Sequence, residues 1–280
     1  MSTPAGTNRA FKTVYSCLEY LAVAIIVLIF FVPIAWIVLT AFKPSQDVYT
    51  LKLFFTPTLA NFRAIFSYPL DFGPYLLNSF IVTTATLVIG IPISLFAAYS
   101  LSRFKIAGKQ GLLFWILSTQ FIPPVIIALP FFILFRNLGL LDTRISLIIV
   151  NLCIIIPFAI WLIKGFLDGI PTDIEEAALI DGCSRFGVLT RIIVALAKPG
   201  ILTATVFCFV LSWNEFMFPL ILSRQNATTL PVALMLLNAE KGVIWEQMAA
   251  AGIVLVIPSV ILVLLVRKHF VQGLTLGALD

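Results

Sequence analysis

The sequence predicts an all-α, polytopic membrane protein with six transmembrane helices, and three observations support this. Apolar residues make up 61% of the 280-residue chain and charged residues only 11%, whereas a soluble domain carries about 25% charged residues. The mean hydropathy is +1.09. The apolar runs are about 20 residues long, which suits spanning helices better than the shorter strands of a membrane barrel. A water-soluble globule is therefore excluded.

Six apolar runs can cross the membrane, because at about 1.5 Å per residue each exceeds or approaches a hydrocarbon core of about 30 Å. In chain order they are Tyr20–Phe42, Tyr75–Leu101, Leu112–Phe135, Ile145–Phe166, Ile201–Leu222 and Met248–Val266. The first run is too long for a signal peptide and is not followed by a small-residue cleavage site. We expect one membrane domain over residues 1–280, without a separate soluble domain.

Each of the six runs contains at least one proline. The prolines are Pro33, Pro92, Pro123 with Pro124 and Pro130, Pro157, Pro219 and Pro258. Membrane helices tolerate proline where neighbouring groups satisfy the freed carbonyl. Prolines in every run also suit helices that bend around a shared cavity or that must flex. The pattern favours a channel or transporter without specifying one.

Basic residues are unequally divided between the two sides of the predicted membrane domain. The richer side has Arg9, Lys12, Arg103, Lys105, Lys109, Lys164, Arg185, Arg191, Lys198, Arg267 and Lys268. Since cytoplasmic loops carry the excess of Lys and Arg, both termini are predicted to be cytoplasmic. These membrane-edge residues and the lipid head groups account for the net charge of +5, so no nucleic-acid partner is expected.

Neither a metal site nor a disulfide is predicted. The four cysteines, Cys17, Cys153, Cys183 and Cys208, show no CxxC spacing. Two of them fall within predicted membrane helices, and the other two are predicted to face the reducing cytoplasm.

The cytoplasmic loop at about residues 167–198 contains a short acidic helix, Thr-Asp-Ile-Glu-Glu-Ala-Ala-Leu-Ile-Asp-Gly over residues 172–182. Thr172 and Glu175 have the spacing of a capping box. The acids of the first turn favour the positive end of the helix dipole. Ala177 and Ala178 are strong helix formers with small side chains, and Gly182 can supply a C-terminal stop with positive φ. We interpret this helix as a docking element for a partner outside the membrane.

A second helical stretch is expected from Ser184 to about Ala197. Arg185 and Arg191 interrupt its apolar residues, which recur near helical spacing and are Phe186, Leu189, Ile192, Ile193 and Leu196. From the residues alone, an ordinary amphipathic linker that lies on the membrane surface remains the alternative for the whole loop.

The same loop resembles the cytoplasmic signature of binding-protein-dependent ABC importer permeases. That signature is Glu-Ala-Ala, three residues, Gly, nine residues, Ile, one residue and Leu-Pro. This chain has Glu176-Ala177-Ala178, then Gly182, then Ile192, and departs only where Val194-Ala195 replaces the Leu-Pro end. The departure removes a helix stop but leaves the docking half intact.

Nearly the whole chain resembles the six-helix partner of the maltose-type, carbohydrate-importing subfamily. The matching segments are Leu77-Asn78-Ser79, Tyr99-x-x-Ser102-Arg103-Phe104, Leu138-Gly139-Leu140, Trp213-Asn214-Glu215-Phe216 and Phe270-Val271-Gln272-Gly273-Leu274-Thr275-x-Gly277. The order and spacing of these segments carry the resemblance, since each is weak alone.

The resemblance implies a translocation subunit that performs no catalysis and has no cofactor of its own. ATP and Mg²⁺ are expected on a separate ATPase, and this chain has no GxxxxGK[ST] phosphate loop. The implied partners are a homologous second permease, two ATPase subunits, an extracytoplasmic solute-binding protein and membrane lipids, and the implied location is the bacterial cytoplasmic (inner) membrane.

Two segments are implied to contact the ATPase. The coupling residues are Glu175, Glu176, Ala177, Ala178, Leu179, Asp181 and Gly182. In the C-terminal tail, residues 267–280, the residues Gln272, Gly273 and Thr275 are implied to reach into the ATPase dimer interface. A frayed terminus is the alternative for the tail.

The polar residues Trp213, Asn214, Glu215 and Asn151 are candidates for the solute path. Glu215 is the one acid in the predicted spans, and a buried carboxylate is expected to face a cavity or a partner. An aromatic ring beside an amide and an acid can hold a sugar. The alternative is a structural polar contact between helices.

These observations lead to a permease subunit of an ATP-driven importer for a sugar or related polyol. The first alternative is a permease for a non-sugar solute. The second is an ion-coupled secondary carrier, which would need buried ion sites, and Glu215 alone supports these weakly. A scaffold subunit without a pore is a third, disfavoured by the proline-containing helices.

Overall fold

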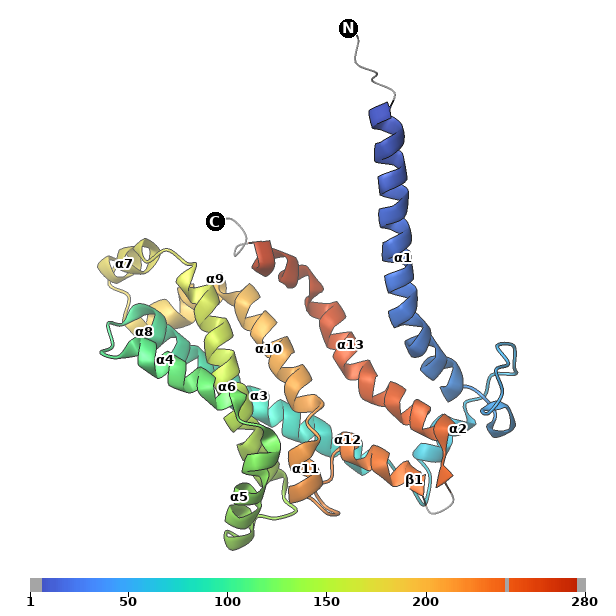
Figure 1. The fold of residues 1–280 in the computed structure, drawn as a ribbon. Coiled ribbons are helices and arrows are strands. Elements are labelled where there is room, and N and C mark those ends of the chain that lie inside the picture. Colours follow the sequence, from blue (N-terminus) through green and yellow to red (C-terminus); the bar gives the residue numbers. More distant parts are fainter. Residues whose placement is uncertain (1–6, 240–241, 276–280) are drawn as a thin grey trace. The chain divides into compact units, whose positions relative to one another are not determined.

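A computed structural model of the chain describes residues 7–239 and 242–275 (Figure 1). The chain divides into two compact units. The first combines Met1–Pro69 with Leu237–Ile253, and the second combines Leu70–Leu236 with Val254–Asp280. Nearly all of the described secondary structure is helical, as the length of the apolar runs predicts.

The first unit holds α1 and a small set of elements beyond it. They are α1 (Thr7–Ala41), the 3-10 helix η1 (Ser45–Asp47), α2 (Ala60–Ile65), the strands β1 (Asn238–Ala239) and β2 (Gly242–Val243), and the start of α13 (Trp245–Thr275). The two strands pair antiparallel, with Asn238 opposite Val243.

The end of α1 is fastened to the segment that follows it. The Asn61 amide donates hydrogen bonds to the carbonyls of Ala41 (2.9 Å) and Lys43 (2.8 Å). Lys43 is fully buried, and its ammonium group donates to the Thr50 carbonyl at 3.0 Å and lies 4.2 Å from the centre of the Trp36 ring. The carbonyl and the ring face together compensate for the loss of water around the cation.

The second unit contains the remaining helices. They are α3 (Gly73–Arg103), α4 (Lys109–Ser118), η2 (Thr119–Phe121), α5 (Pro124–Asn137), α6 (Arg144–Asp168), α7 (Asp173–Ile180), α8 (Arg185–Gly187), the π-helix η3 (Val188–Ile193), α9 (Val194–Leu196), α10 (Lys198–Trp213), α11 (Met217–Leu222), α12 (Leu230–Ala233), η4 (Leu234–Leu237) and the rest of α13.

Within the described residues, five helical segments are long and apolar enough to cross a membrane. They are Leu18–Ala41, Gly73–Arg103, Arg144–Asp168, Lys198–Leu222 and Trp245–Arg267. Each overlaps a predicted run, so these five predictions are confirmed. The remaining run, Leu112–Phe135, is not one straight helix: Lys109–Phe121 and Pro124–Asn137 meet at a bend of 90°.

The bend has its cause in two consecutive prolines. Ile122 precedes Pro123 and adopts an extended ψ of 118°, as steric contact with a following proline ring favours. Pro123 and Pro124 also lack the N–H groups that would continue the helix from α4. The break between α10 and α11 is different, because residues 214–216 contain no proline.

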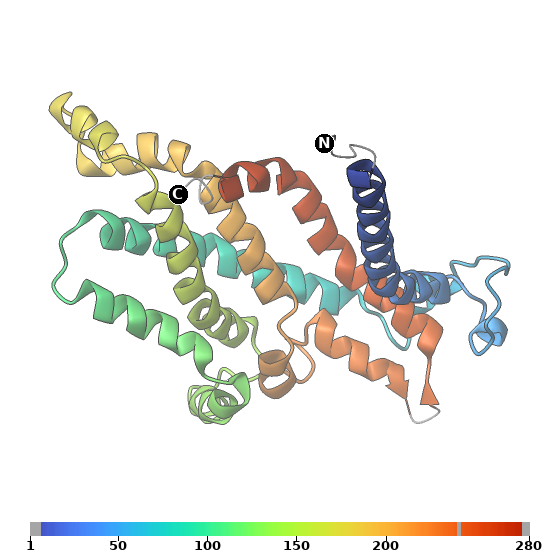
Figure 2. The same ribbon diagram turned by 45° about the horizontal axis from the view of Figure 1, so that its top comes forward.

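The second unit is built around α3, α6 and α10, which pack side by side (Figure 2). Their shared core includes Ala98 of α3, Ile155, Ala159 and Ile163 of α6, and Ala204 of α10. Small residues allow the close approach, as is usual between membrane helices.

Gly200 marks the tightest of these contacts. A Cβ atom at this position would lie 2.2 Å from Cγ and 2.6 Å from Cβ of Phe166. Because Cβ of Phe166 is fixed to its backbone, rotating the ring cannot relieve the overlap, and α10 would have to move away from α6.

We expect Gly200→Ala to destabilise the protein by about 1–3 kcal/mol, the usual cost of overpacking a core. The matched control is Gly165→Ala on α6, where a Cβ meets nothing within 4 Å. Thermal unfolding of the purified variants in detergent measures the difference. Equal melting temperatures for the two variants would contradict the contact.

Asp142 ties the loop between α5 and α6 to the loop after α11. Its carboxylate accepts hydrogen bonds from the backbone N–H groups of Arg224, Gln225, Asn226 and Ala227, at 2.9–3.1 Å for the shortest bond of each. Its own N–H donates to the Leu222 carbonyl at 2.8 Å. Four consecutive N–H groups around one carboxylate form a concave anion site in which the anion is part of the same chain.

Two polar residues near the start of α3 also bond this loop. The Asn78 amide donates to the carbonyls of Asn226 (2.9 Å) and Thr228 (2.8 Å). The Ser79 hydroxyl accepts from the Leu230 N–H at 2.8 Å. The segment Leu77-Asn78-Ser79 therefore has a structural role.

The hydrogen bonds to Asp142 predict a pH effect on stability. Burial by itself would raise the pKa of Asp142, but the four backbone N–H groups outweigh it and lower the pKa to about 2. Since the folded-state pKa lies below the unfolded value of about 4, the stabilisation is present above about pH 4 and is lost as the pH falls toward 2.

We therefore expect Asp142→Asn to be less stable than the wild type by about 1 kcal/mol near neutral pH, discounted for partial solvent exposure. The difference is expected to shrink at about pH 3 because the Asp142 carboxylate of the unfolded wild type, with its pKa of about 4, is then largely protonated. Melting temperatures of both proteins across this range test it. A difference that stays constant with pH would be inconsistent with an ionised Asp142.

Candidate functional site

The acidic helix predicted from the sequence is α7, which follows α6 after a four-residue turn. Its N-terminus differs from the prediction. Thr172 has helical backbone angles (φ −68°, ψ −26°), and its hydroxyl makes no capping hydrogen bond. The Thr172 carbonyl instead accepts from the N–H groups of Glu175 (2.9 Å) and Glu176 (3.0 Å). The predicted capping box is wrong because the Glu175 side chain has other partners.

Glu175 points into the protein and is held by α3. The Tyr99 hydroxyl donates to one carboxylate oxygen at 2.8 Å, and Nε of Arg103 donates to the other in an ion pair. The Arg103 and Glu175 side chains are only 9% and 8% exposed. Nη2 of Arg103 also donates to the Ile170 carbonyl at 2.9 Å. The buried carboxylate therefore meets a cation and a hydroxyl, and both oxygens are satisfied.

A second polar contact joins α3 to the end of α6. The Ser102 hydroxyl donates to Oδ1 of Asp168 at 2.6 Å. Lys164, one turn earlier on α6, forms an ion pair with the other oxygen of Asp168. The last helical turn of α3 therefore bonds Asp168 before the loop at residues 169–172 and Glu175 after it.

The C-terminus of α7 is the glycine stop expected from the sequence. Gly182 has a φ of +86°. The Cys183 N–H donates to the Ala178 carbonyl at 3.0 Å, and the Gly182 N–H donates to the Leu179 carbonyl at 3.1 Å. These two bonds form a Schellman motif.

The second helical stretch is also present, with a π-helical interior that the sequence did not predict. The Ser184 hydroxyl caps it by accepting from the Gly187 N–H at 3.1 Å. The structure runs through α8, η3 and α9 to Leu196. Leu189 and Ile193 are buried against the core that contains Tyr99, so the stretch packs on the bundle and does not lie free as a linker.

The side chains of α7 divide between two faces. Glu175 and Ala178 are buried in the chain, and Leu179 is half-buried against the same core. Glu176, Ala177, Asp181 and Gly182 are exposed, and Ile180 is 85% exposed. Within this chain, the outward face carries acids, the small residues Ala177 and Gly182, and two large apolar side chains, Ile180 and the 41% exposed Ile174. The sequence could not separate these two sets.

The candidate solute-path residues lie mostly in helix-stabilising contacts. Trp213 is 1% exposed, its indole N–H donates to the Leu255 carbonyl at 2.8 Å, and its ring packs on Phe80 and Phe209. The Asn214 amide donates to the Val210 carbonyl at 2.8 Å. These contacts favour a structural role for Trp213 over a sugar-binding surface.

Glu215 and Asn151 complete this set. Glu215 lies between α10 and α11, and its carboxylate accepts from the Phe218 N–H at 2.9 Å, so it caps the first turn of α11 from the position before the N-cap residue Phe216. Asn151 is buried on α6 and donates to the Leu147 carbonyl at 2.9 Å, while its carbonyl oxygen has no protein partner among the described residues. No hydrogen bond in the described part of the chain joins Asn151 to the other three.

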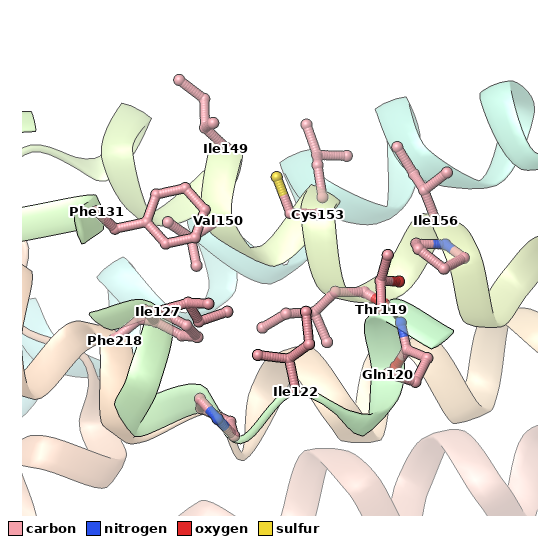
Figure 3. Close-up of a pocket in the computed structure, with 14 residues that line it drawn as sticks. Thr119, Gln120, Ile122, Ile127, Phe131, Ile149, Val150, Cys153, Ile156 and Phe218 are labelled. Atoms are coloured by element: carbon pink, nitrogen blue, oxygen red, sulfur yellow. Dashed lines mark hydrogen bonds between the residues drawn. The ribbon is translucent and has the colours of Figure 1, made fainter. Parts of the chain in front are cut away.

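A cavity of about 640 Å³ lies at the bend between α4 and α5 (Figure 3). Its lining is mainly apolar and comes from the bent pair, from α6 and from Phe218 of α11. Gln120 reaches from η2 to the Ile154 carbonyl at 3.0 Å. The prolines favoured helices that bend around a cavity, but nothing in the sequence indicated which residues line this one.

The tail residues are described only in part. The backbone of α13 remains helical through Thr275, so Gln272, Gly273 and Thr275 continue that helix. Their side chains, and all of residues 276–280, lie outside the described residues.

Comparisons with known proteins identify the family. A family model described as "Binding-protein-dependent transport system inner membrane component" matches residues 90–276. The chain is 34% identical to the trehalose transport system permease protein SugB of Mycobacterium tuberculosis, over 98% of both chains. It is 32% identical to the trehalose/maltose transport system permease protein MalG of Thermococcus litoralis, over 88% of this chain and 90% of that one.

A solved structure agrees with this match. It is a bacterial ABC transporter involved in the import of the acidic polysaccharide alginate, and one of its chains is 25% identical to this protein. The TM-score is 0.74, over 96% of this chain and all of that one. From the family match, these relatives and the helical architecture, the chain belongs to the inner membrane components of binding-protein-dependent transport systems.

Proposed function

We propose that this chain is the translocating permease subunit of an ATP-driven importer for a sugar or a related polyol. The observation that carries the proposal is the outward face of α7, which is exposed, acidic and bordered by a glycine stop, in a protein of this transport family. The solute class is supported by relatives that transport trehalose or maltose and by the alginate importer.

In this proposal the outward face of α7 docks on a separate ATPase subunit. Closure of the ATPase dimer moves α7, and the permease changes from inward-facing to outward-facing. ATP and Mg²⁺ are bound by the ATPase, and this chain contributes no catalytic group. The complete transporter contains a homologous second permease, two ATPase subunits and an extracytoplasmic solute-binding protein. Both termini of this chain are cytoplasmic, and the tail around Gln272 reaches the ATPase dimer interface.

The exposed face of α7 gives the sharpest test. Ala177→Trp adds bulk on the outward face and is expected to leave a folded, membrane-inserted protein that loses its ATPase subunit on purification. Transport should fall by about tenfold or more, since a lost contact of about 1.4 kcal/mol already changes binding tenfold. Ala178→Trp adds the same bulk inside the protein, so we expect it to lower the melting temperature of the permease itself.

The control is Ala107→Trp, a bulky change at another exposed position outside the spanning segments. It should retain both the ATPase and transport. If Ala177→Trp also retains the ATPase and transports normally, α7 is not the docking helix. Direct assay of ATP hydrolysis in the purified transporter, with and without loaded binding protein, separates the ATP-driven importer from an ion-coupled carrier.

The hydrogen bond from the Phe218 N–H to Glu215 predicts separate effects on protein stability and on solute transport. Glu215→Gln keeps an oxygen that can accept from the Phe218 N–H, so we expect normal assembly, while removal of the charge alters transport. Glu215→Leu leaves that N–H unpaired at a cost of about 1–3 kcal/mol, so both stability and transport should fall. Detergent stability and solute uptake are the two measurements. Wild-type uptake by Glu215→Leu would show that the acid has no role.

A further inference from the structure

In the proposed function the ATPase displaces α7, and this displacement has to reach the membrane-spanning helices of the same chain. Both oxygens of the Glu175 carboxylate are bonded by residues of a single helix, α3. Tyr99 and Arg103 are four residues apart, so they project from the same side of α3. A carboxylate held at both oxygens by one helix cannot rotate or slide without breaking a bond.

The connection includes the backbone before α7 as well. Arg103 bonds the Ile170 carbonyl while it pairs with Glu175, so one guanidinium group spans the turn and the helix. Beneath these polar contacts, Ala178 of α7 packs in the same apolar cluster as Tyr99 and Leu101 of α3. Polar and apolar contacts therefore join α7 to the end of α3.

The other end of α3 holds the loop after α11. Asn78 and Ser79 bond the segment 226–230, while Tyr99 and Arg103 bond Glu175. α3 has 31 residues and is about 45 Å long. Next to Pro92, Gly90 of α3 packs so closely on α6 that an added Cβ would lie 2.8 Å from Ile155. This contact supports the helix where its own hydrogen bonding is interrupted.

We propose that Tyr99, Arg103 and Glu175 form a clamp, the Glu175 clamp, that transmits displacement of α7 to α3 and through α3 to the loop at residues 223–230. The proposal rests on the proposed function, in which an ATPase subunit binds the outward face of α7. Glu175 is then a positioning residue that acts inside this chain and does not contact the ATPase.

The test uses the complete transporter reconstituted in lipid, with its partner permease, ATPase subunits and binding protein. The variants are Glu175→Ala, Arg103→Ala, the double variant and Tyr99→Phe, which removes one hydrogen bond at nearly constant volume. Three quantities are measured: the amount of ATPase that co-purifies, the stimulation of ATP hydrolysis by loaded binding protein, and solute uptake. Glu19→Ala, which removes an exposed carboxylate from α1, is the matched control.

We expect each clamp variant to retain the ATPase. Stimulation and uptake should fall by about tenfold in Glu175→Ala and in Arg103→Ala, within the usual range of coupling between sites. The double variant should lose less than the sum of the two single losses, since the two residues share the ion pair. Glu175→Gln can accept from Arg103 through its amide oxygen and donate to the Tyr99 hydroxyl oxygen, but it lacks the charge of the ion pair, so it should restore only part of the stimulation. Tyr99→Phe should give a smaller loss in the same direction.

Two results would overturn the proposal. Normal stimulation in Glu175→Ala and Tyr99→Phe would show that the Glu175 clamp transmits nothing. Release of the ATPase in the clamp variants, but not in Glu19→Ala, would show that the clamp only presents the docking helix. Failure of the wild-type chain to retain any ATPase is a separate outcome, because it refutes the proposed function and not only the clamp.

Discussion

A carboxylate that leaves water keeps its charge only if other groups replace the solvent, and for Glu175 these groups are the Arg103 guanidinium and the Tyr99 hydroxyl. The placement of α7 depends on these bonds. Arg103 of α3 holds both Glu175 and the Ile170 carbonyl, so the turn between α6 and α7 is fixed to α3. The outward residues of α7 therefore keep one orientation relative to α3. Removing Arg103 or Glu175 would leave the other as an unpaired buried charge, which costs far more than the net value of the pair.

Local features of the sequence predicted most of the fold. Apolar runs long enough to cross a bilayer predicted the spanning helices, because lipid imposes one length on every span. Gly182 predicted the end of α7, because a positive φ favours glycine within its own short segment. The paired prolines, Pro123 and Pro124, indicated a disturbed helix, but the angle of 90° depends on packing against other helices.

The remaining features depend on contacts between distant parts of the chain. Glu175 fits a capping box by spacing, yet its partners on α3 lie more than 70 residues away. The role of Asp142 in joining two loops could not be predicted from the sequence, because its backbone partners lie 82–85 residues away. An aromatic ring beside an acid suggested a solute site at Trp213 and Glu215. In the structure Trp213 bonds the Leu255 carbonyl of another helix, and Glu215 bonds an N–H at the start of α11. Their part in transport remains a prediction.

The division of α7 into two faces also constrains how this protein can change over evolutionary time. A substitution at Glu175 has to be compensated at Tyr99 or Arg103, which are encoded in the same gene and inherited together. On the proposed docking, a substitution at Glu176 or Ala177 has to be compensated in the gene of the ATPase subunit. The outward residues Glu176, Ala177 and Gly182 are then constrained by a partner chain, which agrees with their place in the family signature, whereas Glu175 is constrained only within this chain.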